Sequence, residues 1–214
     1  MQQNTHTKRK VSDIPIFLDK ELYSRLENLV NTNGYDYKKN IGDFKLRDTA
    51  LQCLLILSGL RISEALQLKK IQFKRYADRI VLANVKTLKN GKMRTRITLP
   101  LSDESSLSVF SFVVAAWLDR IPEDKSYVFP GATGFGGFHW NQPLSRFRAH
   151  RIIKLANDHF PHWYRSVCET IYGRLVFHND AWKLKEFMGL KRLDSTTPYV
   201  KGTWEEDEDR IFQI

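Results

Sequence analysis

Cysteine is scarce in this chain, and long apolar runs are absent from it. Only two cysteines occur among the 214 residues, Cys53 and Cys168, and both fall within helical apolar patterns. We interpret them as core residues and expect no disulfide framework, no zinc site and no other bound metal. No apolar run reaches membrane-spanning length, and residues 1–10 are polar and basic without a hydrophobic signal region. We therefore expect a cytoplasmic protein without a membrane partner.

A nucleotide-binding motif is also missing. Residues 131–137 are rich in glycine, yet they lack the Gly-Lys-Ser/Thr ending with which a P-loop grips phosphates and magnesium. This stretch is therefore expected to be a loop. With neither a P-loop nor a clustered acidic metal site, the sequence predicts no cofactor.

Acidic residues are fewer than basic ones. The chain has 34 lysines and arginines against 24 aspartates and glutamates, which gives a formal charge of +10. Such an excess indicates a nucleic-acid partner, although ribosomal and membrane-surface proteins share it. A length of 214 residues with 42% hydrophobic residues predicts one domain with a proper core. Residues 1–12 are expected to be a basic arm that either touches a DNA backbone or is simply solvated.

Most of the chain has helical periodicity, but the period changes to two residues after Arg79. Residues 80–85 form one expected strand, residues 93–99 form another, and Asn90-Gly91 is the turn between them. In the second strand the apolar row begins at Met93 and the polar row begins at Arg94. We therefore predict an α+β fold that is mainly α-helical, with a small antiparallel sheet near residues 79–99. Three lysines near the hairpin tip either reach into a cleft or only aid solubility: Lys86, Lys89 and Lys92.

One arginine is expected at a break between two helices. Residues 48–57 are apolar enough for a buried helix, Gly59 supplies the conformation that ends it, and Ser63 is expected to cap the next helix. Arg61 then lies between the helices, where its guanidinium can present a planar fork of donors to a phosphodiester. The alternative is a surface arginine that pairs with Glu64.

A second basic surface is expected on the helix after residues 141–143. Basic residues are set against apolar ones in a pattern suited to lying beside a phosphate backbone, although a merely solvated face would look the same. The basic residues are Arg146, Arg148, Arg151 and Lys154, and the apolar ones are Leu144, Phe147, Ile152 and Leu155.

Three short motifs follow toward the end of the chain. His162 and Arg165 are three residues apart, so they share one face near the start of a helix. A further helix is expected to end at Gly189, and the Ser-Thr-Thr-Pro-Tyr run at 195–199 predicts a short helix that carries Tyr199. Each of these motifs is common by chance when it is taken alone.

Together and in this order, the motifs resemble those of the tyrosine recombinases, or phage-type integrases. The resemblance covers roughly residues 14–199. It implies that Arg61 and Arg165 clamp the scissile phosphate, that His162 is the basic partner of Arg165, and that Tyr199 is the nucleophile. The matching segments are residues 58–66 (SGLRISEAL), 86–87 (KT), 161–165 (PHWYR), 188–189 (MG) and 195–199 (STTPY).

The resemblance also assigns supporting roles. Lys86 is the implied general acid of the hairpin, and Lys89 is its rival because the usual Lys-Thr-Gly turn is interrupted here. Glu64 matches a commonly acidic position and is expected to orient the neighbouring basic residues.

Three features depart from the family's pattern. Leu190 stands where a histidine or tryptophan is usual and cannot donate a hydrogen bond, so Lys191 or Lys185 would have to compensate. Around the site, Ser166 replaces a common histidine and Pro198 directly precedes the nucleophile. About a dozen residues precede the matching part, so the helical DNA-binding domain of many members is not expected. The chain would then be a trimmed catalytic domain or a compact minimal recombinase.

The implied function is that of a site-specific DNA recombinase or integrase, which cleaves and rejoins strands of double-stranded DNA attachment sites through a 3′-phosphotyrosyl intermediate without ATP or metal. Relaxation by a type IB topoisomerase-like reaction, a catalytically weakened DNA-binding protein of the same fold and a basic RNA-binding protein are the alternatives. The expected division is an arm (1–12), a catalytic domain (13–200) and a tail (201–214). The tail is expected to be exchanged between subunits of a homo-oligomer, a tetramer on DNA, or to fold back on its own domain.

Overall fold

The computed structural model describes residues 42–88, 91, 93–102, 105, 107–133, 137–157 and 160–196. The expected basic arm, the expected tail and the boundaries at 13 and 200 lie outside these residues, as do Lys89, Lys92 and Tyr199. No helix within the described ranges is long and apolar enough to cross a membrane.

Helices are the main elements of the described chain, as the sequence predicts. The α-helices are α2 (Asp43–Ser58), α3 (Ile62–Ala65), α4 (Ser108–Leu118), α5 (Arg146–Asn157), α6 (Pro161–Thr170) and α7 (Ala181–Met188). Shorter turns of helix are the 3-10 segments η2 (Lys70–Gln72) and η4 (Leu193–Ser195), and the π-helix η3 (Ile171–Val176), which continues α6.

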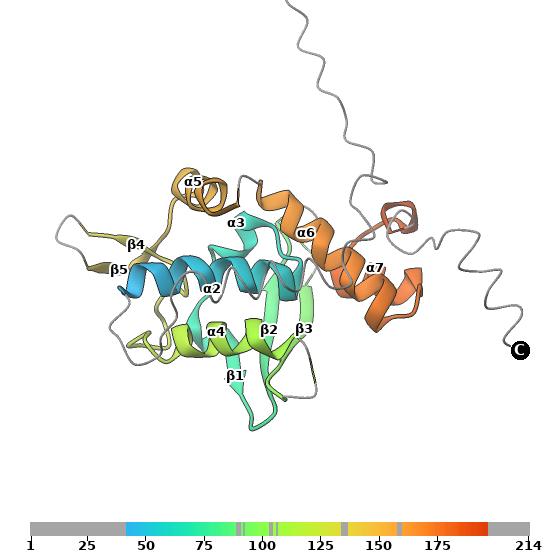
Figure 1. Cartoon of the computed structure of the whole chain (residues 1–214), viewed down its shortest axis with the longest axis horizontal. Helices are drawn as coiled ribbons and strands as arrows, with labels where there is room; N and C mark the ends of the chain where they lie inside the picture. The colour runs from blue at the N-terminus through green and yellow to red at the C-terminus, as the bar shows by residue number, and fades with distance from the viewer. Residues whose placement is uncertain are drawn as a thin grey trace, which may run out of the picture. The chain divides into compact units, whose positions relative to one another are not determined.

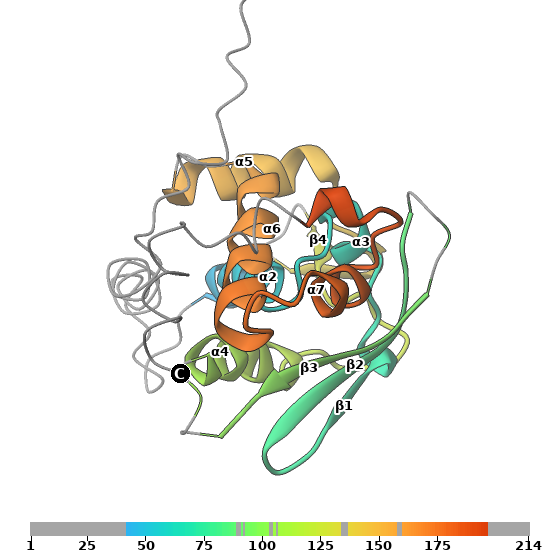
Figure 2. The same ribbon diagram turned by 90° about the vertical axis from the view of Figure 1, so that its right-hand side faces the viewer.

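Helix α2 is the centre of the packing. Its residues from Leu46 to Ser58 are buried with one exception, Asp48, which is partly exposed. Figures 1 and 2 show α2 between α4 on one side and α5 with α6 on the other. A hydrogen bond from the Tyr164 hydroxyl to Gln52 Oε1, at 2.7 Å, ties α6 to the middle of α2. The expectation of a buried helix here is confirmed.

The main sheet is antiparallel, with the order β1-β2-β3. The strands are β1 (Phe73–Arg75), β2 (Arg79–Lys86) and β3 (Met93–Pro100). The predicted hairpin is therefore confirmed, with β1 as an additional strand on the outer side of β2. A second pair, β4 (Pro130–Ala132) and β5 (Phe138–Pro143), flanks the glycine-rich stretch for which only a loop was expected.

The face of the hairpin that points into the protein changes near its tip. In the body of the sheet Ile80 pairs with Leu99 and both are buried, but toward the tip Val85 pairs with Arg94 and these two are buried. Asn84, just before Val85, has a positive φ of 57°, which interrupts the regular alternation. The predicted alternation is therefore wrong near the tip, because Met93 is exposed there and Arg94 lies inside.

Both cysteines are buried and free of disulfides, as expected of core residues. Burial raises the pKa of the Cys53 thiol to about 12 and raises that of Cys168 as well. Cys53 lies in α2 and Cys168 in α6, so the two thiols come from helices that pack on each other.

Candidate active site

The end of α2 is a turn that requires glycine. Gly59 has φ 58° and ψ 24°, and its N–H donates to the Leu55 carbonyl at 2.9 Å. A Cβ atom added here would lie 2.6 Å from Met188 Cε and 3.0 Å from Cys168 Sγ. The prediction that Gly59 ends the helix is confirmed, and α6 and α7 both approach the turn closely.

Arg61 lies between α2 and α3, as predicted. Its Nη1 atom donates to Glu64 Oε1 at 3.0 Å, and its backbone N–H donates to Glu64 Oε2 at 2.9 Å. The expectation that Ser63 caps the helix is wrong, because Arg61 occupies the N-cap position and the Glu64 carboxylate satisfies its N–H. The Arg61 side chain is 31% exposed, so part of its guanidinium can still reach an anion.

Glu64 connects Arg61 to the hairpin. The carboxylate is buried, and its Oε1 atom also accepts a hydrogen bond from the Leu88 backbone N–H at 3.2 Å. Hydrogen bonds to a buried charged group contribute about 1.5–3 kcal/mol each. The Glu64 carboxylate thus binds two segments, the turn that carries Arg61 and the hairpin residue Leu88. These contacts fit the orienting role expected of it.

Arg165 lies in α6 and is almost completely buried. Its Nη1 atom donates to the Gly59 carbonyl at 2.5 Å, and its Nη2 atom donates to the Met188 carbonyl at 3.4 Å. Its Nε atom pairs with Glu169 Oε1 at 3.1 Å, one helical turn further along α6. The guanidinium is therefore fixed at the junction of α2, α6 and α7, next to the turn that carries Arg61.

His162 stands at the start of α6 with its side chain exposed. Partial desolvation lowers its pKa below the ordinary value of 6.5, and the positive charges of Arg165 and Arg61 lower it further. The three candidate residues thus share one electrostatic neighbourhood, although they come from two distant segments. At neutral pH the imidazole is therefore uncharged and able to accept a proton.

The hairpin places Lys86 at the end of β2, where its side chain is exposed. Thr87 and Leu88 follow, and Leu88 is the residue whose N–H binds Glu64. Lys86 is thus two residues from Leu88, which binds Glu64, the partner of Arg61. Its rival for the general acid role, Lys89, lies outside the described residues.

The end of α7 closes against the hairpin. Gly189 has a positive φ of 63°, and a Cβ atom there would lie 3.2 Å from Arg94 Cγ and 3.3 Å from Thr87 Cγ2.

Leu190 follows Gly189, and its N–H donates to the Lys185 carbonyl at 3.0 Å. The Lys185 ammonium lies over the Trp182 ring, 4.7 Å from its centre, whereas Lys191 is exposed. Tyr199 follows Thr196, the last residue that the structure describes, by three positions in the sequence.

Sequence reasoning missed Arg94. This residue is 5% exposed, and its Nη1 atom donates to the Ser58 carbonyl at 2.8 Å, one residue before the carbonyl that Arg165 binds. The available indication was Asn84, because asparagine tolerates a positive φ better than other side chains and so can change the face of a strand.

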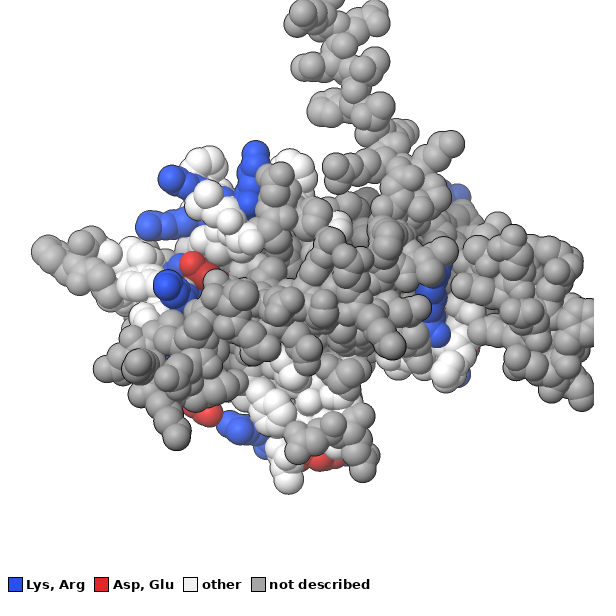
Figure 3. Space-filling view, in the orientation of Figure 1, with Lys and Arg blue, Asp and Glu red and all other residues white. Residues whose placement is uncertain are grey.

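Helix α5 carries the expected basic surface, but its apolar pattern differs from the prediction. Ala149 and Ile153 are buried, whereas Phe147 is 80% exposed and Leu155 is 77% exposed. The predicted basic residues are all exposed, and Figure 3 shows Lys and Arg side chains gathered over this part of the molecule. They are Arg146, Arg148, Arg151 and Lys154.

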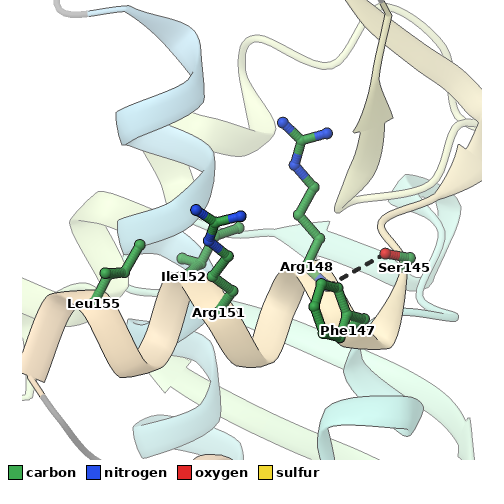
Figure 4. A pocket seen from close by; sticks show the side chains of 6 residues that line it. All are labelled: Ser145, Phe147, Arg148, Arg151, Ile152 and Leu155. Carbon is green, nitrogen blue, oxygen red and sulfur yellow. Dashed lines mark hydrogen bonds between the residues drawn. The ribbon is translucent and has the colours of Figure 1, made fainter.

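The exposed side of α5 forms a pocket of about 560 Å³. Figure 4 shows Arg148 and Arg151 rising from the same side of the helix, and the Arg148 N–H donates to Ser145 Oγ at 3.3 Å. Apolar side chains complete the lining: Phe147, Ile152 and Leu155. The pocket is thus lined by two guanidiniums and by apolar side chains.

Comparisons with known proteins give one family. The pattern described as the phage integrase family matches residues 17–204, whereas no curated protein matches the chain. Among solved structures, the XerH site-specific recombinase bound to difH substrate before cleavage has a TM-score of 0.59 and 18% identity, with 88% of this chain covered. Its complex with palindromic difH after cleavage has a TM-score of 0.61, 18% identity and 89% coverage.

A transposon integrase has the same fold. The Tn1549 integrase in complex with a circular intermediate DNA has a TM-score of 0.51 and 13% identity, with 91% of this chain and 64% of that chain covered. This chain spans about half the length of the XerH structures, 52% in each case.

Proposed function

Because the chain belongs to the phage integrase family over residues 17–204, we propose that it is a site-specific DNA recombinase that cleaves and rejoins strands through a covalent tyrosine link. The observation that carries the proposal is the shared neighbourhood of Arg61, His162 and Arg165, in which both guanidiniums lower the pKa of the imidazole. Double-stranded DNA with attachment sites is the proposed partner.

Two guanidiniums suit the reacting phosphodiester. Negative charge develops on the non-bridging oxygens as phosphorus is attacked, and preorganised donors in a site with little water stabilise that charge strongly. Arg61 has guanidinium nitrogens without a partner among the described residues and is the better candidate for direct contact. Arg165 is fixed by three protein partners and adds positive charge beside it.

Tyr199 is the proposed nucleophile. A phenol with a pKa of about 10 is ionised in only about one molecule in a thousand at neutral pH, so its proton must be removed during the attack. His162, held uncharged by its lowered pKa, can accept that proton. The bond from the phenol oxygen to phosphorus forms while the bond from phosphorus to the 5′ oxygen breaks, which leaves a 3′-phosphotyrosyl link.

The departing 5′ oxygen needs a proton, and a hairpin lysine is the proposed donor. Lys86 is exposed at the end of β2, and Lys89 is the other candidate. Rejoining is the reverse step, in which a 5′ hydroxyl attacks the phosphotyrosine. The covalent link keeps the energy of the phosphodiester, so the exchange itself consumes no ATP.

A second candidate is a DNA-binding protein of this fold that cleaves slowly or not at all. It is favoured by Leu190, whose side chain cannot donate a hydrogen bond to a phosphate. Lys191 is exposed and is the proposed substitute donor. Relaxation of supercoiled DNA, in which the same strand is resealed, uses identical cleavage chemistry.

Assembly through the tail is also part of the proposal. We infer that residues 201–214 pack on a neighbouring subunit, so that four copies act on two duplexes. What supports this is the sequence of the tail, in which an acidic cluster precedes the apolar run Ile211-Phe212.

Trapping of the covalent link tests the proposal. The full chain is incubated with a pool of DNA duplexes that carry a randomised central segment and nicks, so that the short cleaved fragment diffuses away. Adducts that survive denaturation in SDS are isolated, and their DNA is sequenced. We expect adducts with an enriched sequence from the natural chain and none from Tyr199→Phe, which lacks only the hydroxyl.

The results distinguish the candidates. DNA binding without adducts supports the non-cleaving protein, and adducts from both chains exclude Tyr199 as the nucleophile. With the enriched sequence in hand, joining of two differently labelled duplexes supports recombination, whereas relaxation of a plasmid without joining supports the topoisomerase-like reaction. Lys191→Ala, compared with Lys183→Ala on α7, tests the substitute donor.

A further inference from the structure

Arg94 is a buried arginine whose hydrogen bonds are incomplete. Its Nη1 atom donates to the Ser58 carbonyl at 2.8 Å, but its Nε and Nη2 atoms are buried without a hydrogen-bond partner. The guanidinium lies over the Phe187 ring, 4.9 Å from its centre. Unpaired buried donors are costly, and a well-packed apolar residue would avoid that cost. Core stability alone therefore does not explain an arginine here.

The contacts of Arg94 join three segments that each lead to a candidate residue of the reaction. The Ser58 carbonyl lies three residues before Arg61. In the hairpin, Arg94 is paired with Val85, the residue before Lys86. The Arg94 side chain also packs under Gly189, from which the chain continues toward Tyr199.

Two guanidiniums thus occupy the carboxyl end of α2. Arg94 binds the Ser58 carbonyl, and Arg165 binds the next one, that of Gly59. The negative end of a helix dipole favours such cations. Burial lowers the pKa of Arg94 to about 10, and the charge of Arg165 contributes, so the side chain remains positive at neutral pH.

Each strand of the hairpin has its own link to the arginine site. On the β2 side the Leu88 N–H binds the Glu64 carboxylate, and on the β3 side Arg94 binds the Ser58 carbonyl. A hairpin held at both strands cannot pivot about a single attachment. The end of β2, which carries Lys86, is then held in a fixed direction.

We propose that Arg94 is a positioning residue that fixes the β2–β3 hairpin on the end of α2, so that the hairpin lysine meets the leaving 5′ oxygen. This role rests on the proposed recombinase function. Arg94 is too deeply buried to touch DNA itself, so it acts through the lysine.

A change of leaving group tests this role. The DNA is the duplex enriched by trapping, made with oxygen or with sulfur at the bridging 5′ position of the cleaved bond. A thiolate leaves without being protonated, because a thiol has a pKa of about 8.5, far below that of an alcohol. Cleavage of the sulfur substrate therefore does not need the lysine, whereas it still needs the arginines and the tyrosine.

We expect Arg94→Met to slow adduct formation on the oxygen substrate by about 10- to 100-fold, the effect of a small misplacement of a catalytic group. On the sulfur substrate its rate should lie within about 3-fold of the natural chain, as should that of the variant lacking the general-acid lysine. Arg96→Met, a change at an exposed arginine of the same strand, should behave like the natural chain on both substrates.

Other results would overturn the assignment. An equal loss on both substrates would place the effect of Arg94 on the phosphate clamp or the nucleophile, and no loss on either would remove its role. Urea unfolding of Arg94→Met should give a midpoint at or above that of the natural chain, which separates positioning from loss of fold. Absence of adducts from the natural chain on either substrate would instead contradict the proposed function itself.

Discussion

Arg165 donates a hydrogen bond to the Gly59 carbonyl at 2.5 Å across 106 positions of sequence. This bond joins α6, which carries His162, to the turn that carries Arg61. Since Glu169 and the Met188 carbonyl hold the same guanidinium, the charged groups are in place before any DNA arrives. Such preorganisation avoids the cost of ordering these side chains during the reaction.

The buried carboxylate of Glu64 should matter for rate. In Glu64→Gln the amide has only one oxygen, so it cannot accept from the Arg61 guanidinium, the Arg61 N–H and the Leu88 N–H as the carboxylate does. We expect adduct formation to slow by about 10- to 100-fold. Gel analysis of adducts over time measures this, with Glu123→Gln at an exposed site as the control. Equal rates for the two variants would refute the orienting role.

The pKa of His162 should be visible in the pH dependence of cleavage. In the proposed mechanism the uncharged imidazole is the active form, so the rate should fall on acidification only below pH 6.5, the ordinary value. Removal of one positive charge in Arg61→Gln should raise the pKa of His162, which NMR titration of the imidazole measures. Arg75→Gln, a change at a surface arginine paired with Asp119, is the control. A titration that does not move in Arg61→Gln would contradict the shared neighbourhood.

The same shift predicts a stability effect of definite sign. The unfolded chain binds the His162 proton at a higher pH than the folded chain does, so this residue lowers stability as the pH falls below 6.5. In His162→Gln that part of the acid sensitivity should disappear. Urea midpoints measured on both sides of pH 6.5 give the difference, and an unchanged difference would argue against the lowered pKa.

The basic residues of α5 should affect the salt dependence of DNA binding. Each phosphate contact releases counterions, so Arg151→Gln should reduce the slope of log affinity against log salt by about 0.9. Fluorescence anisotropy at several salt concentrations measures the slope. Lys125→Gln removes an exposed lysine in the loop after α4 and should leave the slope unchanged. Identical slopes for both variants would mean that α5 does not face the DNA.

The turn at Gly59 should be intolerant of any side chain. Gly59→Ala combines a left-handed backbone with a Cβ atom 2.6 Å from Met188 Cε. We expect a loss of about 2–4 kcal/mol in the free energy of unfolding, from backbone strain and overpacking together. Gly91→Ala is the matched control, since Gly91 has φ 63° but nothing within 4 Å of the added atom. Urea unfolding measures both, and similar losses would show that packing contributes nothing.

Local rules were sufficient for much of the fold. The apolar run before Gly59, Gly91 of the hairpin and the glycine after Met188 each favour their conformation through nearby residues, and α2, the β2–β3 pair and the end of α7 follow. Arg61 could be placed between two helices for the same reason. The family resemblance then supplied the roles of the site residues, which no local rule contains.

The rest depended on contacts between distant segments. Arg94 is buried because Asn84 changes the inner face of the hairpin and the α2 end offers a carbonyl, and neither condition is visible in the alternation of β3. Glu64, which sequence could pair only with Arg61, also binds Leu88. On α5, Phe147 and Leu155 have helical spacing with buried residues but lie on the opposite side, since Ala149 and Ile153 suffice to pack the helix.

The thiol of Cys168 offers a chemical reporter of the junction between α2 and α6. It lies against the turn at Gly59, and burial raises its pKa, so an alkylating reagent can attack it only when the two helices separate. In a Cys53→Ala background, the alkylation rate would measure how often the arginine site comes apart. The same measurement with DNA present would reveal how firmly substrate binding closes it.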